Sequence, residues 1–374
     1  MSELTVGILG TARGMTLARL FDAHPYTRVT ALCDRIDARR KHALEDLPHA
    51  VGFQQYEDML GSSDRPDIVV VASEPMDHAR HSCMALEAGC AVLSEVPAVH
   101  TLEDAQTLVD TVERTGGFYM FGENCNYYNP IRVWKRFRDE GVLGDVVHAE
   151  GEYIHDIRPI TWLDMDGKPV AMNERRSRSD IRPHWRADYD PIRYITHSLG
   201  PVLWLMETRC THVSCMGAPP RAHETIKSPD LQVAIMSTEI DAPIRQTVAF
   251  GVPHEPGRQW FSIYGTKAHV EWKRAHWDEP KMYVDGQDVR DMIRMDWPVA
   301  PDWLTHLAGK EGHGGIDAAL VEDFVDALHN GKPSPIDVHT GLDYSLPGVY
   351  AAMSAHAGGK LIRIPNSRTE RIVP

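Results

Sequence analysis

Short apolar runs alternate with amphipathic stretches between residues 4 and 121. The apolar runs are rich in β-branched residues, which is typical of buried strands, and they cover residues 4–9, 29–33, 68–72, 91–94 and 118–121. The stretches between them carry apolar residues at helical spacing and cover residues 15–23, 38–47, 78–88 and 102–115. Strand and helix repeated in this order predict a doubly wound parallel sheet with a ligand site at the carboxyl ends of its strands.

The pattern changes after Pro130. A helix is predicted over residues 131–140 and a strand over 146–154, and later helices over 317–328 and 351–357. Further β-rich runs follow one another without helices between them, at residues 212–216, 233–239, 246–250, 261–264 and 269–272. This succession predicts a second α/β domain with a largely antiparallel sheet.

The length agrees with two domains, because 374 residues contain about two units of the usual 100–200 residues. We place a dinucleotide-binding domain at residues 1–126 and a second, substrate-binding domain at 127–374, whose C-terminal tail is expected to return to the first domain. Residues 156–193 are polar and weakly periodic. A segment of this kind in a compact enzyme is predicted to be a lid or binding segment.

Composition narrows the classes of partner. Lys and Arg number 39 and Asp and Glu 53, so the net charge is −14, which disfavours nucleic acid and anionic membranes. No run approaches the ~20 apolar residues of a membrane span, and the first residues lack the features of a signal peptide, so we expect a cytoplasmic protein. The six cysteines form no CxxC pair and are expected to be reduced core residues.

The first strand is followed by Gly7, Gly10 and Gly14, a variant of the glycine-rich dinucleotide fingerprint. Glycines let the backbone approach a pyrophosphate, and the next helix offers its N-terminal N–H groups. A plain tight turn is the alternative. Asp34 follows Gly14 by 20 residues, where a carboxylate is expected to accept hydrogen bonds from the ribose hydroxyls and to favour NAD over NADP. Arg35 could partly reverse that preference. A carboxylate exposed to solvent at the end of a strand is the alternative for Asp34.

Several segments now match one family. Residues 73–78 and 88–97 resemble the glucose–fructose oxidoreductase/inositol dehydrogenase (Gfo/Idh/MocA) superfamily, over nearly the whole chain. Five segments resemble the NAD-dependent glycosidase branch of this superfamily, namely residues 95–97, 122–128, 152–158, 194–201 and 312–317. This branch contains α-N-acetylgalactosaminidases and neighbouring sulfoquinovosidases. One departure is Val96, which stands where ordinary superfamily members have a lysine.

The resemblance implies an N-terminal Rossmann domain, a C-terminal domain with an open sheet, a homodimer or homotetramer, and a tightly bound NAD that is recycled. The residues that it and the motifs assign to the cofactor are Gly7, Leu9, Gly10, Thr11, Ala12, Arg13, Gly14, Asp34, Arg35, Ser73, Glu74, His78, Glu95, Val96, Glu123 and Asn124.

In the branch that the chain resembles, C3 of a sugar is oxidised by NAD, the C2 proton is removed, the aglycone leaves, water adds, and C3 is reduced again. The resemblance assigns catalysis to Tyr194 and His197, which share a face if they lie on one helical turn. His197 would handle the C3 hydroxyl proton and Tyr194 the C2 proton, which requires positive charge near the phenol. Arg193 stands where ordinary dehydrogenases often have Asp. A satisfied interior histidine and a packing tyrosine are the alternatives.

Five arginines occur within residues 174–186, which is unusual in an acidic chain, and Arg158 and Arg193 flank them. Arginine suits carboxylate or sulfonate groups, and Trp185 could stack on a sugar. We therefore predict an anionic sugar, such as a uronide or sulfoquinovose, bound by Arg158, Trp185, Arg186 and Arg193, with His313 nearby. A solvated loop with local ion pairs is the alternative.

The leading hypothesis is an NAD-dependent glycoside hydrolase without net redox change. A net NAD(P)-dependent sugar or cyclitol dehydrogenase or reductase is the second hypothesis, and a non-catalytic cofactor-binding regulator is the third. His155 and Asp156 could join His313 and Asp317 at a metal, but the branch chemistry needs none, so no metal is expected. The sugar, its anomer and the aglycone stay open.

Overall fold

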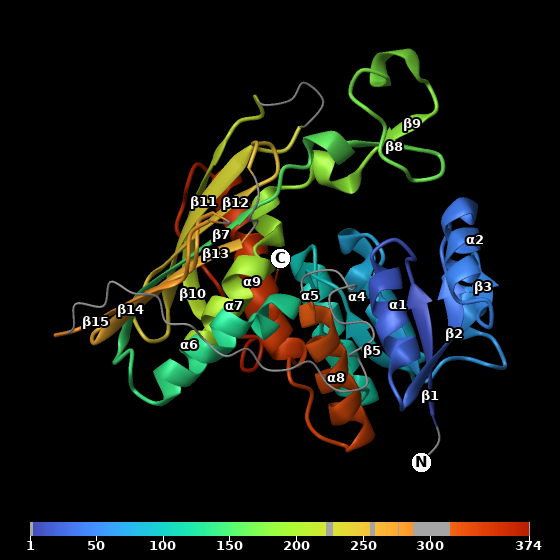
Figure 1. Ribbon diagram of the computed structural model, residues 1–374, viewed down its shortest axis with the longest axis horizontal. Coiled ribbons are helices and arrows are strands. Elements are labelled where there is room, and N and C mark those ends of the chain that lie inside the picture. Colours follow the sequence, from blue (N-terminus) through green and yellow to red (C-terminus); the bar gives the residue numbers. More distant parts are fainter. Residues whose placement is uncertain (1–2, 222–226, 255–258, 276, 287–314, 374) are drawn as a thin grey trace.

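The structure is a computed structural model, and it describes residues 3–221, 227–254, 259–275, 277–286 and 315–373. Figure 1 shows a parallel sheet with its helices on one side of the molecule and a long open sheet on the other, with helices between them. The fold class predicted from the sequence is confirmed. Among the described residues, no helix has the length and apolar character needed to cross a membrane.

The first sheet is parallel and has the strand order β3-β2-β1-β4-β5-β6. Its strands are β1 Leu4–Leu9, β2 Thr27–Cys33, β3 Val51–Phe53, β4 Ile68–Val71, β5 Ala91–Ser94 and β6 Tyr119–Phe121. Its helices are α1 Gly14–Ala23, α2 Asp37–Asp46, α3 Tyr56–Leu60, α4 His78–Glu87 and α5 Leu102–Thr115. The sequence pattern missed β3, because two of its three residues are exposed and it has no apolar run.

The strand order reverses between β1 and β4, and this switch point positions the site. The turn after β1 passes close to the end of β4. Gly10 has φ +90°, and a Cβ there would lie 2.3 Å from the carbonyl oxygen of Ala72. Only glycine fits this conformation and this contact, so the two loops meet at the carboxyl edge of the sheet.

The second sheet has the order β15-β14-β13-β7-β12-β11-β10-β16. Its strands are β7 Val146–Ile154, β10 Cys210–Ala218, β11 Leu231–Thr238, β12 Ile244–Ala249, β13 Gln259–Gly265, β14 Ala268–Glu271, β15 Lys281–Val284 and β16 Ile362–Arg363. The β7–β12 pair is parallel and the other pairs are antiparallel, so the sheet is mixed. Alternate residues of β7, among them Gly151 and Tyr153, are buried on one face.

Four long helices complete the described part of the chain: α6 Asn129–Asp139, α7 Thr196–Met206, α8 Ile316–His329 and α9 Val338–His356. The helix α9 contacts β10 and also α5 and β6, so it joins the two sheets. It is much longer than the helix predicted over residues 351–357. Gly341 and Pro347 lie inside it, and thirteen of its nineteen residues are buried, which weakens the amphipathic period that sequence analysis depends on.

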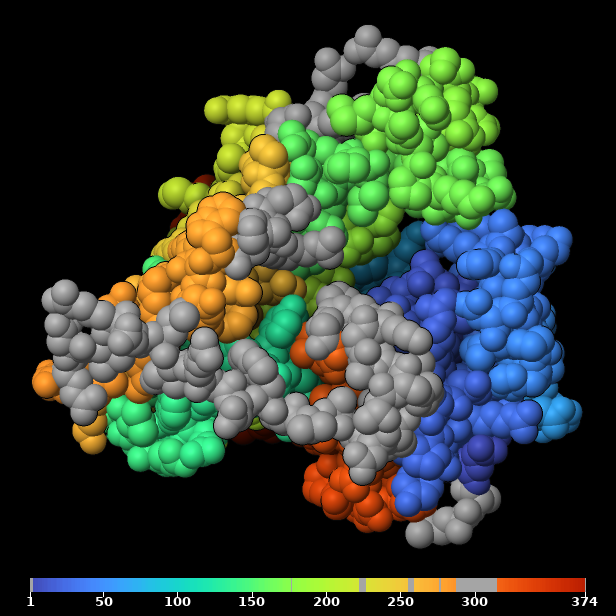
Figure 2. Space-filling view, in the orientation of Figure 1, coloured from blue at the N-terminus to red at the C-terminus, as the bar shows by residue number. Residues whose placement is uncertain are grey.

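The polar segment predicted to be a lid forms a two-stranded hairpin, β8 Trp162–Asp164 and β9 Ile181–Pro183, with short 3₁₀ turns around it. Figure 2 shows this segment, in green, above the blue N-terminal sheet and its helices. The C-terminal tail returns to the first sheet's helices, because the Ile372 amide donates to Gln106 Oε1 on α5 at 2.7 Å.

Candidate functional site

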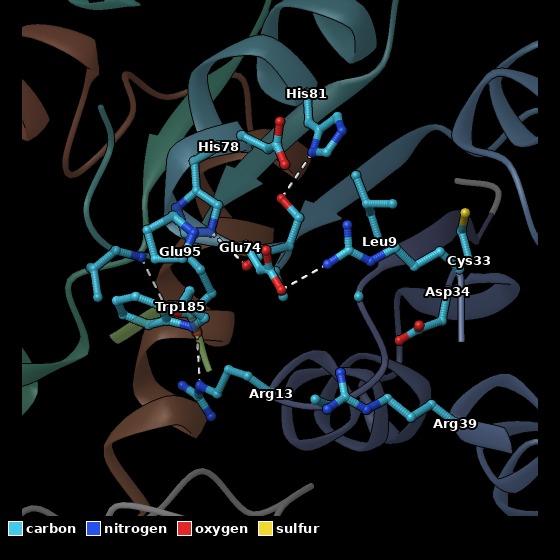
Figure 3. A pocket seen from close by; sticks show the side chains of 18 of the residues that line it. Leu9, Arg13, Cys33, Asp34, Arg39, Glu74, His78, His81, Glu95 and Trp185 are labelled. Carbon is cyan, nitrogen blue, oxygen red and sulfur yellow. Dashed lines mark hydrogen bonds and ion pairs between the residues drawn. The ribbon is translucent and has the colours of Figure 1, made fainter. Parts of the chain in front are cut away.

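A cavity of about 460 Å³ lies between the carboxyl edge of the parallel sheet and the second part of the chain. One end is lined by residues after β2, including Asp34 and Arg39, and the other by Tyr194 and His197. Figure 3 shows Asp34 and Arg39 on one side of this cavity, and Glu95 and Trp185 on the other.

The glycine-rich turn fits a pyrophosphate. The helix α1 begins after Arg13 with no side-chain cap on its free N–H groups and no acidic residue in its first turn. Uncapped N–H groups at a helix N-terminus are donors for an anion. Gly14 is needed for packing, because a Cβ there would lie 2.6 Å from Ile8 Cγ2, so the helix sits directly on the sheet.

Asp34 lies at the end of β2, and its carboxylate organises the turn. Oδ2 accepts from the backbone N–H and the hydroxyl of Thr11, both at 2.9 Å, and Oδ1 accepts from the Ile36 N–H at 2.8 Å. These contacts fix the carboxylate on the cavity wall and leave lone pairs for ribose hydroxyls. The arrangement is the one expected for binding the adenosine ribose of NAD.

Most residues predicted to bind the cofactor line the cavity. They are Leu9, Gly10, Ala12, Arg13, Asp34, Arg35, Ser73, Glu74, His78, Glu95, Val96 and Asn124. Four others are not part of the lining, namely Gly7, Thr11, Gly14 and Glu123. Three of these act through packing or through Asp34, and Glu123 lies behind His197.

His78 joins two loops at the edge of the sheet. Its Nδ1 lies 2.8 Å from the Pro97 carbonyl oxygen and its Nε2 lies 3.0 Å from the Ser73 carbonyl oxygen. Burial lowers the pKa of this imidazole, although both carbonyls oppose the shift. A neutral imidazole has one N–H, so the ring donates to one of these two carbonyls while it packs between the loops after β4 and β5.

Arg13 connects the glycine-rich turn to the second part of the chain. Its two terminal nitrogens donate to both oxygens of Asp317, each at 2.8 Å, and its Nε lies 2.9 Å from Glu95 Oε1. Asn124 donates to the same Asp317 carboxylate at 2.7 Å. Arg13 is thus a structural crosslink as well as a cavity residue, and the helix α8 begins at this point.

His197, near the start of α7, is held by a buried carboxylate. Glu123 is fully buried, and its Oε1 lies 2.8 Å from His197 Nδ1 and accepts from the Cys125 N–H at 3.0 Å. Burial alone would raise the pKa of Glu123, but His197 and the Cys125 amide bring it below the ordinary value. An ionised Glu123 accepts the Nδ1 proton, so Nε2 of a neutral His197 is unprotonated.

Tyr194 lies in a cluster of rings beside His197. Ring centres of Tyr153, Trp185 and His197 lie 5.7, 5.7 and 5.3 Å from its own. Burial raises the pKa of this phenol, and the positive charges of Arg186 and Arg13 oppose the increase. The charge that the sequence argument required near Tyr194 is therefore present, although burial outweighs it in this state.

Arg186 lies over the same cluster, with its guanidinium carbon 4.0 Å from the centre of the Trp185 ring and 5.0 Å from that of Tyr194. Its Nε has no hydrogen-bond partner, and it forms no ion pair with any carboxylate that the structure describes. A cavity-lining cation without a counter-charge is a candidate anion ligand.

The other predicted substrate residues lie elsewhere. Arg158 makes a bidentate ion pair with Asp156. Arg193 donates to the His100 carbonyl at 2.5 Å and lies near Asp190. Neither arginine lines the cavity. Trp185 does line it. His313 lies outside the described residues.

One group of three potential metal ligands occurs among the described residues. One atom each from Glu123, Cys125 and His197 lies within 4.8 Å of the others. Nδ1 of His197 is shared between the Glu123 carboxylate and the Cys125 sulfur at 3.4 Å. Burial and Glu123 raise the pKa of the Cys125 thiol well above its ordinary value, so a protonated, hydrogen-bonded cluster accounts for this arrangement without a metal.

Sequence reasoning missed several lining residues, including Tyr153, Arg39, Arg182 and His184. The alternating burial in β7 could have pointed to Tyr153, because every second residue there faces inward. No motif in the sequence marks Arg39, which lies on α2 and lines the cavity near Asp34.

Comparison with known proteins agrees with this geometry. The profile of the oxidoreductase family with an NAD-binding Rossmann fold matches residues 4–123, and that of the glycosyl hydrolase 109 C-terminal domain matches residues 131–226. A glycosyl hydrolase family 109 protein of Porphyromonas gingivalis is 31% identical over 98% of this chain and 85% of its own length. An α-N-acetylgalactosaminidase of Tannerella forsythia is 26% identical over 91% of this chain and 80% of its own length.

Solved structures share the fold. An oxidoreductase of Agrobacterium radiobacter in complex with NAD+, L-tartaric acid and magnesium has a TM-score of 0.76 at 17% identity, covering 97% of this chain and 98% of that one. A scyllo-inositol dehydrogenase of Lactobacillus casei with bound NAD(H) has a TM-score of 0.72 at 16% identity, covering 97% and 99%. This chain therefore belongs to the glycosyl hydrolase 109 family, and it is an NAD-dependent enzyme of the Gfo/Idh/MocA oxidoreductase type.

Proposed function

We propose that this enzyme hydrolyses the glycosidic bond of an anionic sugar through transient oxidation at C3, with no net change in the redox state of NAD. The observation that carries the proposal is that Tyr194 and a carboxylate-held His197 line the same cavity as the glycine-rich turn. This wall offers two proton acceptors beside a site suited to a nicotinamide cofactor.

When bound, NAD supplies an acceptor and later a donor of hydride at one sugar carbon. The glycine-rich turn and the N-terminus of α1 would hold its phosphates, and Asp34 its ribose. His197 takes the proton of the C3 hydroxyl at Nε2 and returns it when C3 is reduced again. Glu123 keeps Nδ1 protonated and stabilises the positive charge that His197 then carries.

Tyr194 removes the C2 proton after C3 has become a ketone, because a neighbouring carbonyl acidifies that C–H bond. The pKa of the phenol is raised by burial, so this step depends on the positive charge that surrounds Tyr194. Arg186 is the main source of that charge, because the smaller effect of Arg13 on the pKa of Tyr194 is opposed by its ion-pair partner Glu95. The aglycone then leaves C1 and takes up a proton, and water adds its hydroxyl at C1 and a proton at C2 of the unsaturated ketone. Return of the hydride and of a proton to C3 would complete the hydrolysis.

Among the described residues, the carboxylates closest to Tyr194 and His197 favour an elimination: Glu95 lines the cavity, and Glu123 lies behind His197. Ordinary glycosidases use two free carboxyl groups, one on each side of the glycosidic bond. Here Glu95 is paired with Arg13 and Glu123 with His197. These two carboxylates have structural partners and are poorly suited to act as acid and nucleophile.

An anionic group on the sugar is supported by Arg186. Its guanidinium has no counter-charge among the described residues and lies over the Trp185 ring at the catalytic end, where a carboxylate or sulfonate could accept two parallel hydrogen bonds. A uronide and a sulfoquinovoside share this chemistry. They differ in the shape of the anion, which a substrate comparison would resolve.

The test uses the purified enzyme and aryl glycosides of neutral and acidic sugars. We expect nitrophenol release without net formation of NADH, and faster release from acidic than from neutral glycosides. One NADH formed per sugar, with free sugars as substrates, would instead show a net dehydrogenase.

We also propose a domain boundary near residue 126, between β6 and α6. The first family match ends at residue 123 and the second begins at residue 131, which supports this boundary.

A homodimer or homotetramer through the open sheet is supported by apolar side chains exposed on its strands, among them Val147, Met216 and Ile235. Six buried free cysteines support a reducing compartment such as the cytoplasm.

A further inference from the structure

The β8–β9 hairpin belongs to the second part of the chain but contacts the helix that follows β2. Arg39 of α2 donates through Nη2 to the Gly167 carbonyl in the hairpin loop at 2.8 Å. The approach is close, because a Cβ at Gly167 would lie 2.4 Å from Arg39 Nη2. Figure 1 shows the hairpin projecting from the second sheet toward α2.

A second contact lies on β9. Arg182 Nη1 is 3.7 Å from Glu74 Oε1, and Arg35 donates to the same oxygen at 2.8 Å. Glu74 follows β4, at the switch point of the parallel sheet. The hairpin is therefore connected to the loops that would surround a dinucleotide, at two places and by different chemistry.

Side chains of this segment face the cavity at the adenosine end. Leu163, Arg182 and His184 line the same space as Asp34 and Arg39. The His184 Nδ1 accepts from the Arg186 N–H at 3.1 Å, and burial together with nearby arginines lowers the pKa of His184 to about 3. The neutral ring therefore carries its proton on Nε2, as a hydrogen-bond donor on the cavity wall.

The charges favour an anion between the two walls. Counted over the whole lining, arginines exceed carboxylates by one positive charge: the six arginines are Arg13, Arg35, Arg39, Arg80, Arg182 and Arg186, and the five carboxylates are Asp34, Glu57, Glu74, Asp77 and Glu95. Arg39 forms no ion pair with a described carboxylate, and its contact with the hairpin is to a neutral carbonyl. A dinucleotide brings two phosphates, which would compensate this excess.

We propose that the β8–β9 hairpin forms the outer wall of the NAD site and slows release of the cofactor. Leu163, Arg182 and His184 are the residues that it contributes, and the Arg39–Gly167 contact holds the hairpin in place. The proposal depends on NAD binding and is independent of which sugar the enzyme takes. An enzyme that reuses one NAD in every turnover benefits from slow exchange, whereas a net dehydrogenase must release NADH each time.

The experiment measures release of NADH. Enzyme loaded with NADH is diluted into excess NAD+, and the decay of NADH fluorescence gives the dissociation rate. Arg182→Met removes a charged group from the wall, and Gly167→Ala places a Cβ against Arg39. We expect each variant to release NADH about tenfold faster than the unchanged enzyme.

Each variant has a matched control. Arg178 lies in the same hairpin, is paired with Asp180 and has the same 32% side-chain exposure as Arg182, but it does not line the cavity. Gly141 has φ +73°, close to the +77° of Gly167, with nothing within 4 Å of a built Cβ.

Arg178→Met and Gly141→Ala should leave the release rate within about twofold of the unchanged enzyme. Equal rates in all five proteins would overturn the proposal, and so would controls that accelerate release as much as the test variants. Neither outcome depends on glycoside hydrolysis, so failure of the hairpin proposal and failure of the proposed function are distinguishable.

Discussion

Replacing Arg186 by methionine should remove the preference for an anionic substrate and leave the fold intact. The side chain lies on aromatic rings and has no ion pair among the described residues, so methionine keeps apolar contact with Trp185 and creates no unpaired carboxylate in the described part of the site. What is lost, under the proposed function, is a charged hydrogen-bond donor to the anionic group of the sugar.

The size of the effect follows from that loss. A hydrogen bond to a charged group contributes about 1.5–3 kcal/mol, and 1.4 kcal/mol corresponds to a factor of about ten. Because Arg186 is partly exposed to solvent, we take the lower part of this range, about 1.5–2 kcal/mol, which corresponds to about 10–30-fold. Arg186 also opposes the raised pKa of Tyr194, so kcat should fall for every substrate.

The assay therefore compares kcat/KM for an acidic and a neutral aryl glycoside, since the effect on Tyr194 is common to both and cancels in the ratio. We expect the ratio to fall about 10–30-fold in Arg186→Met. Arg193→Met is the control, because Arg193 contacts the His100 carbonyl and does not line the cavity, and its ratio should stay within about twofold. Equal losses for the two substrates in Arg186→Met, or an equal change of the ratio in Arg193→Met, would refute this account of specificity.

Three further predictions concern the buried polar groups. Glu123→Gln should lower kcat about 100–1,000-fold, because the carboxylate fixes the His197 tautomer. The Kd for NAD should change less than about threefold, because Glu123 does not line the cavity. Steady-state kinetics and fluorescence titration check these two effects. In the folded state the pKa of Glu123 lies below its ordinary 4.5, because the effect of His197 outweighs burial. The native protein should therefore be more stable than Glu123→Gln above about pH 4.5, and this difference in the free energy of unfolding should decrease as pH falls through the lowered pKa. Urea denaturation at several pH values measures it. Asp317→Asn should lower the free energy of unfolding by about 3 kcal/mol and weaken NAD binding, measured by denaturation and titration, since it leaves the Arg13 guanidinium without its bidentate partner; unchanged stability would contradict the role given to this crosslink.

The parallel sheet was predictable because its signals are local. The strand β4 is a continuous apolar run, β1 and β5 are rich in apolar residues, and Thr101 and Asp104 form a capping box at the start of α5. The Gly10 turn follows from chain order and residue type. The helix α9 escaped prediction over most of its length, because a buried helix with internal Gly and Pro has neither amphipathic period nor favourable propensity.

The candidate site was predictable only in part. Tyr194, His197, Trp185 and Arg186 were selected from motifs and from charge, and all four line the cavity. Arg158 and Arg193 belong to the same run of charge, but Asp156 and the His100 carbonyl bind them, and the sequence does not show which arginines have such partners. Glu123 was expected to bind cofactor, whereas its position behind His197 depends on the packing of α7 against the residues after β6.

The central claim is that hydrolysis proceeds through a ketone at C3 with removal of the C2 proton. The most direct measurement is hydrolysis of an aryl glycoside in D2O, with NMR of the released sugar and simultaneous recording of NADH absorbance. The account predicts deuterium at C2 of the product, no accumulation of NADH, and loss of both hydrolysis and deuterium incorporation in Tyr194→Phe. Hydrolysis that leaves C2 fully protiated, or one NADH formed for each sugar, would contradict it.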